Sequence, residues 1–342
     1  DEQSAVYKIW SLLECVMLRR PFFSWIRSIS TVKPSMDIPE NIYSMPLKIK
    51  TKSGELVELS AVYQDTKPEG SSLGTILTIH GAPGSHKDFK YVTPRLVEAG
   101  IRVIGVNSPG LGLTPGDPRL EYNNYERNQF IQQIVDNLNL KDIVFSGHSR
   151  GTENAIMMAS MNSEKTRGIV LVNPTGLVRH KGIRPEWTLN SLHFLGKISW
   201  LKTATEAFLY QIYTRVLQFK VKTAAECYVC IQYMSQCALG DQKKFIDDLN
   251  NNDEIKVVLL TAGNDHLIEH FITKDLIHSF KDCKLIESES CGDDEETSES
   301  LKKELDDGRN RIGFFFTNEG HFLNKFRAGL IADSVIEILK RK

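Results

Sequence analysis

The sequence predicts an α/β fold built on a mostly parallel sheet. Short apolar runs that predict buried strands, such as Thr75–Ile79 and Ile101–Val106, alternate with stretches of helical spacing such as Phe89–Ala99. Such alternation is typical of parallel strands joined by right-handed crossovers, with helices on both faces of the sheet. Upstream, Leu47–Thr51 and Leu56–Gln64 are alternating runs around a Ser-Gly turn, and they predict an antiparallel hairpin at one edge.

The later elements continue this alternation. Helical spacing recurs at Asn124–Leu138 and Thr152–Ala159, and further strands are predicted at Ile143–Phe145, Ile169–Val172, Val257–Leu260 and Ile312–Phe316. Between residues 177 and 252 the alternation stops, and an aromatic-rich stretch predicts several helices instead. Because an insertion between two strands of a parallel sheet normally lies at their carboxyl ends, where ligands bind, we predict a helical cap there.

These patterns divide most of the chain into a core and an insertion. Residues 46–176 and 253–342 form the predicted α/β core, and residues 177–252 form the predicted cap. Within the core, residues 287–308 contain the acidic run Asp293–Glu296 and several serines. This composition predicts a mobile surface loop.

Residues 1–45 are predicted to form a helical N-terminal extension or a targeting segment. The short apolar stretch Ala5–Leu18 precedes residues 18–33, which contain four basic residues and no acid. Six cysteines in 342 residues make no disulfide framework. We therefore expect an intracellular protein, in the cytoplasm or, if the basic segment is a presequence, in the mitochondrion. No run approaches the ~18 apolar residues of a transmembrane helix.

The overall charge gives no indication of a charged partner. The formal net charge is −1, which provides no general attraction to nucleic acid or to an anionic membrane. The expected partner is a small molecule, and nothing in the sequence determines an oligomeric state. Neither a metal nor an organic cofactor is expected. Cys227 and Cys230 fit the apolar face of a cap helix, and no second ligand pair lies nearby to complete a zinc site.

One serine lies between two glycines where a predicted strand gives way to a helix, in the segment Gly147-His148-Ser149-Arg150-Gly151. A serine hydroxyl needs a base to become a nucleophile, and the base needs a carboxylate to orient it. The oxyanion formed on attack needs N–H donors. In the architecture called the nucleophile elbow, the order along the chain is Ser, then Asp or Glu, then His, with each residue following a strand.

Downstream residues fulfil this order. Asp265 follows one predicted strand and is the candidate acid, and His321 follows the next and is the candidate base for Ser149. The backbone N–H groups of Ala82, after the third predicted strand, and Arg150, at a helix N-terminus, are the candidate oxyanion donors.

Two of these assignments have competitors. Glu269 and Asp275, on the helix that follows, compete with Asp265 for the role of the acid. A cation such as Arg150 in the first turn of a helix opposes the helix dipole, so a carboxylate should compensate it, and Glu153 is the local candidate. The alternative is that the Arg150 side chain contacts an acidic group of the substrate.

The chain resembles the α/β-hydrolase superfamily over about residues 46–342. The resemblance lies in HGAPG at 80–84, NSPGLGLTPG at 107–116, GHSRG at 147–151 and the late Asp265 and His321. Three longer segments resemble a worm-type branch of uncharacterised α/β-hydrolases: HGAPGSHKDFKY, IRVIGVNSPG and GHSRGTENA. The resemblance implies the α/β-hydrolase fold and a catalytic triad, but no particular substrate.

The expected activity is that of a serine carboxylic-ester hydrolase, similar to an esterase or lipase. A serine nucleophile argues against epoxide hydrolase and haloalkane dehalogenase chemistry, which in this superfamily uses an aspartate at that position. The aromatic cap favours an ester with an apolar acyl or alcohol part. The alternatives are an aminopeptidase or amidase, since HGAPG is close to a motif of proline iminopeptidases, an acyltransferase, and a non-catalytic ligand-binding protein on the same fold.

Overall fold

The structure is a computed structural model that describes residues 41–289 and 294–341. The predictions made for residues 1–40 lie outside the described residues. The first strand begins at Ile42, so the predicted boundary after residue 45 falls a few residues inside the sheet.

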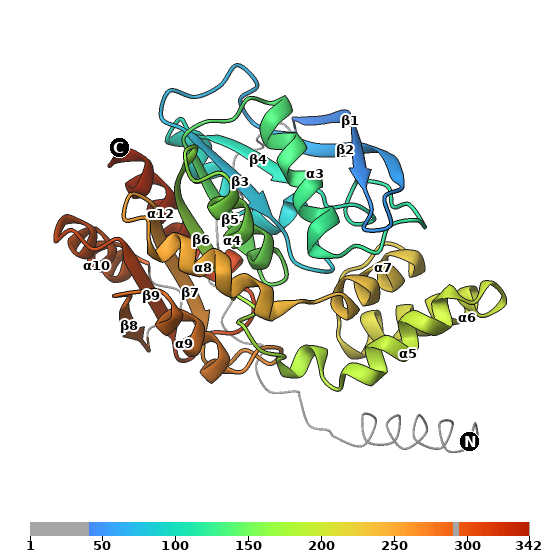
Figure 1. The fold of residues 1–342 in the computed structure, drawn as a ribbon. Coiled ribbons are helices and arrows are strands. Elements are labelled where there is room, and N and C mark those ends of the chain that lie inside the picture. Colours follow the sequence, from blue (N-terminus) through green and yellow to red (C-terminus); the bar gives the residue numbers. More distant parts are fainter. Residues whose placement is uncertain (1–40, 290–293, 342) are drawn as a thin grey trace. The chain divides into compact units, whose positions relative to one another are not determined.

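The described residues form one nine-stranded sheet in the order β1-β2-β4-β3-β5-β6-β7-β9-β8 (Figure 1). Strand β2 pairs antiparallel with both β1 and β4, and all other neighbours are parallel, which confirms the predicted mostly parallel sheet with its antiparallel hairpin. The strands are β1 (Ile42–Lys50), β2 (Leu56–Asp65), β3 (Thr75–Ile79), β4 (Arg102–Val106), β5 (Ile143–His148), β6 (Thr166–Val172), β7 (Lys256–Ala262), β8 (Lys284–Ser288) and β9 (Arg311–Phe316).

Helices cover both faces of this sheet (Figure 1). The helices are α2 (Thr93–Glu98), α3 (Asn124–Asn137), α4 (Gly151–Met161), α5 (Glu186–Lys197), α6 (Ser199–Gln211), α7 (Ala224–Ser235), α8 (Gln242–Asn250), α9 (His270–Ser279), α10 (Glu295–Asp306), α11 (Leu323–Phe326) and α12 (Ala328–Lys340). Short helical turns are η1 (His86–Phe89), η2 (Lys181–Ile183), η3 (Ile212–Val216) and η4 (Leu239–Asp241).

The two faces of the sheet contribute to separate hydrophobic clusters. Successive side chains of a strand point to opposite faces. In β5, Ile143 and Phe145 accordingly join the cluster under α3, α4, α8 and α9, whereas Val144 joins the cluster under α2, α10 and α12. This double burial explains why the central strands appear in the sequence as continuous apolar runs.

The segment predicted as a cap contains α5, α6, α7 and α8. Helix α8 packs against α4, so this part of the segment belongs to the helical layer over the sheet. Helices α5, α6 and α7 pack against one another beyond the carboxyl end of the sheet (Figure 1). None of the helices in the described ranges is long and apolar enough to span a bilayer.

The interpretation of residues 287–308 as a mobile acidic loop requires correction. Strand β8 extends to Ser288 and residues 295–306 form helix α10. Leu301 and Leu305, four residues apart, are buried and join the cluster against α12, which stabilises the helix. The acids Glu295 and Glu296 lie in its first turn, where negative charge is favourable. The sequence analysis missed this helix because most of its residues are charged or polar and only two leucines mark its buried face.

Candidate active site

Ser149 lies on a tight turn between β5 and α4. Its backbone φ is 51°, in the left-handed region that non-glycine residues rarely adopt. Both neighbouring glycines are required by close packing. A Cβ on Gly147 would lie 2.6 Å from the carbonyl oxygen of Gly151, and a Cβ on Gly151 would collide with the carbonyl oxygen of Ile79. The G-x-S-x-G pattern therefore describes a turn that requires glycine at both positions around a partly exposed serine.

The structure brings Ser149, His321 and Asp265 into one hydrogen-bonded chain. His321 Nε2 lies 3.0 Å from Ser149 Oγ, and His321 Nδ1 lies 2.7 Å from Asp265 Oδ2. The three residues follow β5, β9 and β7, whose carboxyl ends meet at the same edge of the sheet. His321 and Asp265 are buried, and Ser149 is partly exposed.

Further hydrogen bonds hold Asp265 in this position. Its Oδ1 accepts the N–H groups of Leu267 at 2.8 Å and Ile268 at 3.1 Å. Burial alone would raise the pKa of Asp265, but the hydrogen bond and charge of His321 together with these two N–H groups lower it below its usual value. The carboxyl group is therefore ionised at neutral pH.

The imidazole of His321 is held in its neutral form. Burial lowers the pKa of His321, and the opposing hydrogen bond and charge of Asp265 do not fully compensate. A neutral imidazole whose Nδ1–H donates to Asp265 presents a free lone pair on Nε2 towards Ser149 Oγ. Nε2 can therefore accept the serine proton.

The competing acids lie elsewhere. Glu269 accepts a hydrogen bond from the N–H of Lys181 and forms an ion pair with Arg184. Asp275 is exposed on α9. Only Asp265, of the three carboxylates considered from the sequence, contacts the His321 ring.

The turn after β3 passes directly beside Ser149. A Cβ on Gly81 would lie 3.2 Å from the Cβ of Ser149. His80 supports the turn: its Nδ1 lies 2.6 Å from the carbonyl oxygen of Gly81, and its Nε2 accepts the N–H of Ser108 at 2.9 Å. Burial lowers the pKa of His80 to about 4, so the ring is neutral.

The two candidate oxyanion donors lie in the turns that meet here. Ala82 follows Gly81, and Arg150 follows Ser149 at the N-terminus of α4. Within residues 41–289 and 294–341, the N–H of neither residue has an acceptor in the protein. Both are therefore available to an oxygen bound next to Ser149.

Two further residues support the site: Asn173, which escaped the sequence analysis, and His148, whose place directly before Ser149 predicts a supporting role. Asn173, directly after β6, donates from Nδ2 to Asp265 Oδ2 at 3.4 Å and accepts the N–H of Leu323 at 3.3 Å. His148 lies 3.2 Å from Asp88 through Nδ1 and 3.1 Å from the carbonyl oxygen of His321 through Nε2. The position of Asn173 at the carboxyl end of β6 is a signal that could have identified it.

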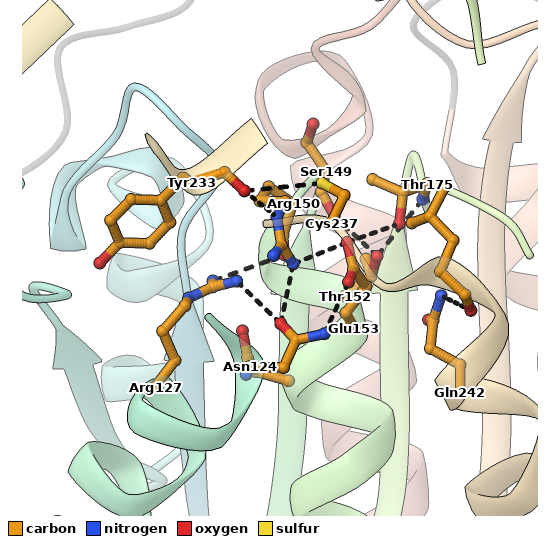
Figure 2. A network of polar contacts seen from close by, with 12 residues as sticks. Asn124, Arg127, Ser149, Arg150, Thr152, Glu153, Thr175, Tyr233, Cys237 and Gln242 are labelled. Atoms are coloured by element: carbon orange, nitrogen blue, oxygen red, sulfur yellow. Dashed lines mark hydrogen bonds and ion pairs between the residues drawn. The ribbon is translucent and has the colours of Figure 1, made fainter. Parts of the chain in front are cut away.

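The side chain of Arg150 points into the protein (Figure 2). It is fully buried, and its Nη1 lies 2.7 Å from Glu153 Oε1 and 3.0 Å from Asn124 Oδ1. Its Nε donates to the carbonyl oxygen of Tyr233, on α7, at 3.3 Å. Compensation by Glu153 is thus what the structure shows, and the buried guanidinium is occupied by protein groups, so the alternative of a substrate contact by this side chain gains no support.

A second arginine completes this polar cluster. Arg127 Nη2 lies 3.5 Å from the carbonyl oxygen of Arg150, and its guanidinium stacks 4.8 Å from the ring centre of Tyr233. Burial and the nearby charge of Arg150 lower the pKa of Arg127 to about 10. Glu153 is therefore the carboxylate that faces two buried cations, and its Oε2 also accepts from Asn124 Nδ2 at 2.9 Å.

Comparison with known proteins agrees with the fold. An uncharacterised protein of Caenorhabditis elegans is 28% identical over 294 residues, covering 83% of this chain and 82% of its own. Among solved structures, an esterase from Exiguobacterium antarcticum (TM-score 0.56, 14% identity) covers 86% of this chain and 100% of its own. The haloalkane dehalogenase DbeA from Bradyrhizobium elkani (TM-score 0.60, 13% identity) covers 88% and 98%. At these identities the two structures establish the fold alone.

The family assignment rests on the sequence itself. Residues 40–340 match the family described as "Alpha/beta hydrolase of unknown function (DUF1057)". The match spans the whole sheet, the turn at Ser149 and the strands that precede Asp265 and His321. The chain therefore belongs to this family of α/β-hydrolases.

Proposed function

We propose that this protein is a serine hydrolase that cleaves carboxylic esters through an acyl-enzyme at Ser149. The observation that carries the proposal is the continuous chain from Ser149 Oγ to His321 Nε2 at 3.0 Å and from His321 Nδ1 to Asp265 at 2.7 Å. These distances lie within the range expected for a nucleophile, its base and the orienting acid.

The first half of the reaction forms the acyl-enzyme. As Ser149 Oγ attacks the ester carbonyl carbon, its proton passes to His321 Nε2, and Asp265 stabilises the resulting imidazolium. The carbonyl oxygen becomes an oxyanion that accepts the N–H groups of Ala82 and Arg150. When the tetrahedral intermediate collapses, the C–O bond to the alcohol breaks and His321 protonates the leaving oxygen.

The second half releases the acid. His321 takes a proton from a water molecule, whose oxygen attacks the acyl carbon. Collapse of the second tetrahedral intermediate breaks the bond to Ser149 Oγ, which recovers its proton from His321. Because the attacking residue is a serine, the reaction differs from that of haloalkane dehalogenases and epoxide hydrolases, which use an aspartate, although a dehalogenase shares the fold.

The preference for an ester with an apolar part is supported by the surroundings of His321. The ring of Phe322 lies 5.6 Å from the His321 ring, centre to centre, and remains exposed. An exposed aromatic ring beside the reacting groups favours an acyl or alcohol chain over a charged group. The esterase from Exiguobacterium antarcticum shows that the same fold carries ester hydrolysis elsewhere.

Fluorophosphonate labelling tests the nucleophile. We expect a covalent adduct on Ser149 that Ser149→Ala abolishes and Ser146→Ala retains, because Ser146 is buried in β5 and hydrogen-bonded to the carbonyl oxygen of Val170. Absence of labelling in the folded wild-type protein would leave the non-catalytic ligand-binding alternative.

The substrate class is tested by kcat/KM for p-nitrophenyl acetate, butyrate, octanoate and laurate. Each methylene buried by a longer chain contributes ~0.8 kcal/mol, about fourfold in affinity, so kcat/KM should rise from acetate to the medium chains. A preference for acetate throughout, or faster cleavage of aminoacyl amides than of any ester, would contradict the apolar-ester assignment.

A further inference from the structure

The carboxylate of Asp88 lies at the turn that carries Ala82, one of the two candidate oxyanion donors. Its Oδ2 accepts the N–H of Gly81 at 3.1 Å, and its Oδ1 accepts the N–H of Ser85 at 3.4 Å. The turn passes close to the carboxylate, since a Cβ on Gly84 would lie 2.9 Å from Asp88 Oδ2. One side chain therefore holds both ends of this turn.

The same carboxylate reaches the turn at Ser149. Asp88 Oδ2 lies 3.2 Å from Nδ1 of His148, the residue directly before Ser149. Nε2 of His148 lies 3.1 Å from the main-chain carbonyl oxygen of His321, the candidate base. Carboxylate and carbonyl oxygens are acceptors, so both contacts are hydrogen bonds when each ring nitrogen of His148 carries a proton. Asp88 and His148 thus link the segments that carry the nucleophile, the base and an oxyanion donor.

Both members of this pair are held in place. The side chain of His148 is 5% exposed and that of Asp88 is 19% exposed. The main-chain carbonyl oxygen of Asp88 accepts Nδ2 of Asn324, in α11, at 2.7 Å. Burial alone would raise the pKa of Asp88, but the hydrogen bond and charge of His148 and the N–H of Gly81 lower it below its usual value. The carboxyl group is therefore ionised at neutral pH.

Capping of a short helical turn explains only part of this arrangement. Ser85 and Asp88 form the capping box of η1, in which Asp88 accepts the N–H of Ser85. That role uses one carboxylate oxygen and no histidine. The second oxygen accepts from Gly81 and faces His148, and it connects η1 to the candidate site.

We propose that Asp88 is a positioning residue that, through His148, holds the oxyanion donor of Ala82 at a fixed place relative to Ser149. The inference rests on the proposed serine hydrolysis. The two donors, Ala82 and Arg150, belong to separate segments, so the distance between them depends on contacts that join these segments. Donors stabilise an oxyanion only when they already point to the place where the charge develops, and a misplacement of about 1 Å can cost ~100-fold in rate.

Asp88→Asn tests the proposal with a side chain of nearly the same shape. An amide has one acceptor end and one donor end, so it cannot accept from Ser85, Gly81 and His148 together. With p-nitrophenyl butyrate we expect kcat to fall ~10- to 100-fold and KM to stay nearly unchanged, because the acyl chain still binds but the oxyanion is poorly stabilised. The affinity for butylboronic acid, whose tetrahedral adduct with Ser149 presents an oxygen to the same donors, should fall by a similar factor.

Two further variants separate this role from a purely structural one. Asp142→Asn makes the same substitution at the opposite end of β5, where Asp142 forms an ion pair with Arg167 at 2.6 Å, and it should leave kcat unchanged. His148→Gln removes the link from the other side, and it carries the same test if Asp88→Asn does not fold. Because the two residues act as a unit, the double variant should lose little more kcat than the worse single variant.

The outcomes distinguish this inference from the proposed function. If the wild type hydrolyses the ester and a variant of Asp88 that is folded by urea unfolding keeps its kcat, the inference is overturned and the serine hydrolase remains. Losses of kcat that multiply in the double variant, or a rise in KM alone, would overturn it as well. If the folded wild type neither hydrolyses esters nor reacts with a fluorophosphonate, the proposed function fails, and the role of Asp88 fails with it.

Discussion

The polar cluster beneath Ser149 is buried, whereas several aromatic side chains of α5 and α6 are exposed, which reverses the usual placement of charged and apolar residues. Beneath the turn, Arg127, Arg150 and Glu153 are fully enclosed (Figure 2). On α5 and α6, Phe194 and Trp200 are exposed to solvent. Burying a charge costs free energy unless an ion pair or hydrogen bonds compensate it. A fully bonded network of this kind also holds its side chains in one geometry. Exposed aromatic side chains change the free energy of folding little, but they favour contact with another molecule. The buried polar cluster should therefore control stability and chemistry. The exposed aromatic side chains should affect association with a partner and hardly affect stability.

The largest expected effect is that of Ser149→Ala, which should reduce ester hydrolysis by ~10⁴-fold or more while leaving the free energy of unfolding nearly unchanged. The substitution removes one hydroxyl group from a partly exposed turn, so the fold should persist. Measurements of kcat/KM and of urea unfolding check both expectations. Near wild-type turnover in this variant would rule out Ser149 as the nucleophile.

Asp265→Asn should lower kcat by ~10⁴-fold, because an amide in place of the carboxylate neither stabilises the imidazolium nor fixes the His321 tautomer. Glu269→Gln is the matched control, since Glu269 contacts Lys181 and Arg184 instead. Equal losses of kcat in the two variants would show that the carboxylate beside His321 has no special role.

Glu153→Gln should destabilise the fold by ~3–5 kcal/mol, because it leaves Arg127 and Arg150 buried without their common carboxylate. Urea unfolding measures the difference. Glu186→Gln, which breaks a half-exposed ion pair with Arg179, should change the free energy of unfolding by less than ~1 kcal/mol. A small effect of Glu153→Gln would mean that water or another group compensates the charges of Arg127 and Arg150.

The buried His180, whose Nδ1 lies 3.0 Å from the carbonyl oxygen of Leu267, should make the stability of the fold depend on pH. Burial lowers the pKa of His180 to about 4, below the 6.5 of an exposed histidine. Between these values the unfolded chain binds a proton that the folded chain does not, so the contribution is complete above pH 6.5 and decreases as the pH falls. About 2 kcal/mol should be lost by pH 5. His180→Gln removes this part of the pH dependence, which urea unfolding at pH 7 and pH 5 would detect as a smaller decrease than in the wild type.

The smallest expected effect on stability is that of Trp200→Ser. The side chain is 78% exposed, so its loss should change the free energy of unfolding by less than ~0.5 kcal/mol. Thermal or urea unfolding provides the measurement. A loss of several kcal/mol would show that the side chain packs against the protein, which would remove the contrast between the two regions.

Much of the fold and the candidate site could be predicted because their signals are local. The alternation of apolar runs and helical spacing predicted the mostly parallel sheet, which the strand pairing confirms. Ser149 was identifiable because its turn requires glycine on both sides, and Asp265 and His321 because each directly follows a strand. Helix α10 escaped because its stabilising contacts, Leu301 and Leu305 against α12, come from a distant part of the chain.

The sequence by itself therefore determined which residues follow which strand and which positions need glycine, since both depend on neighbours along the chain. Only the tertiary structure decided which carboxylate contacts His321, because Asp265 and Glu269 are four residues apart and their directions depend on the loop between them. It also decided that Arg150 points inward and Trp200 outward. The direction of a side chain from a helix is set by what the helix packs against, and those partners lie far away in sequence.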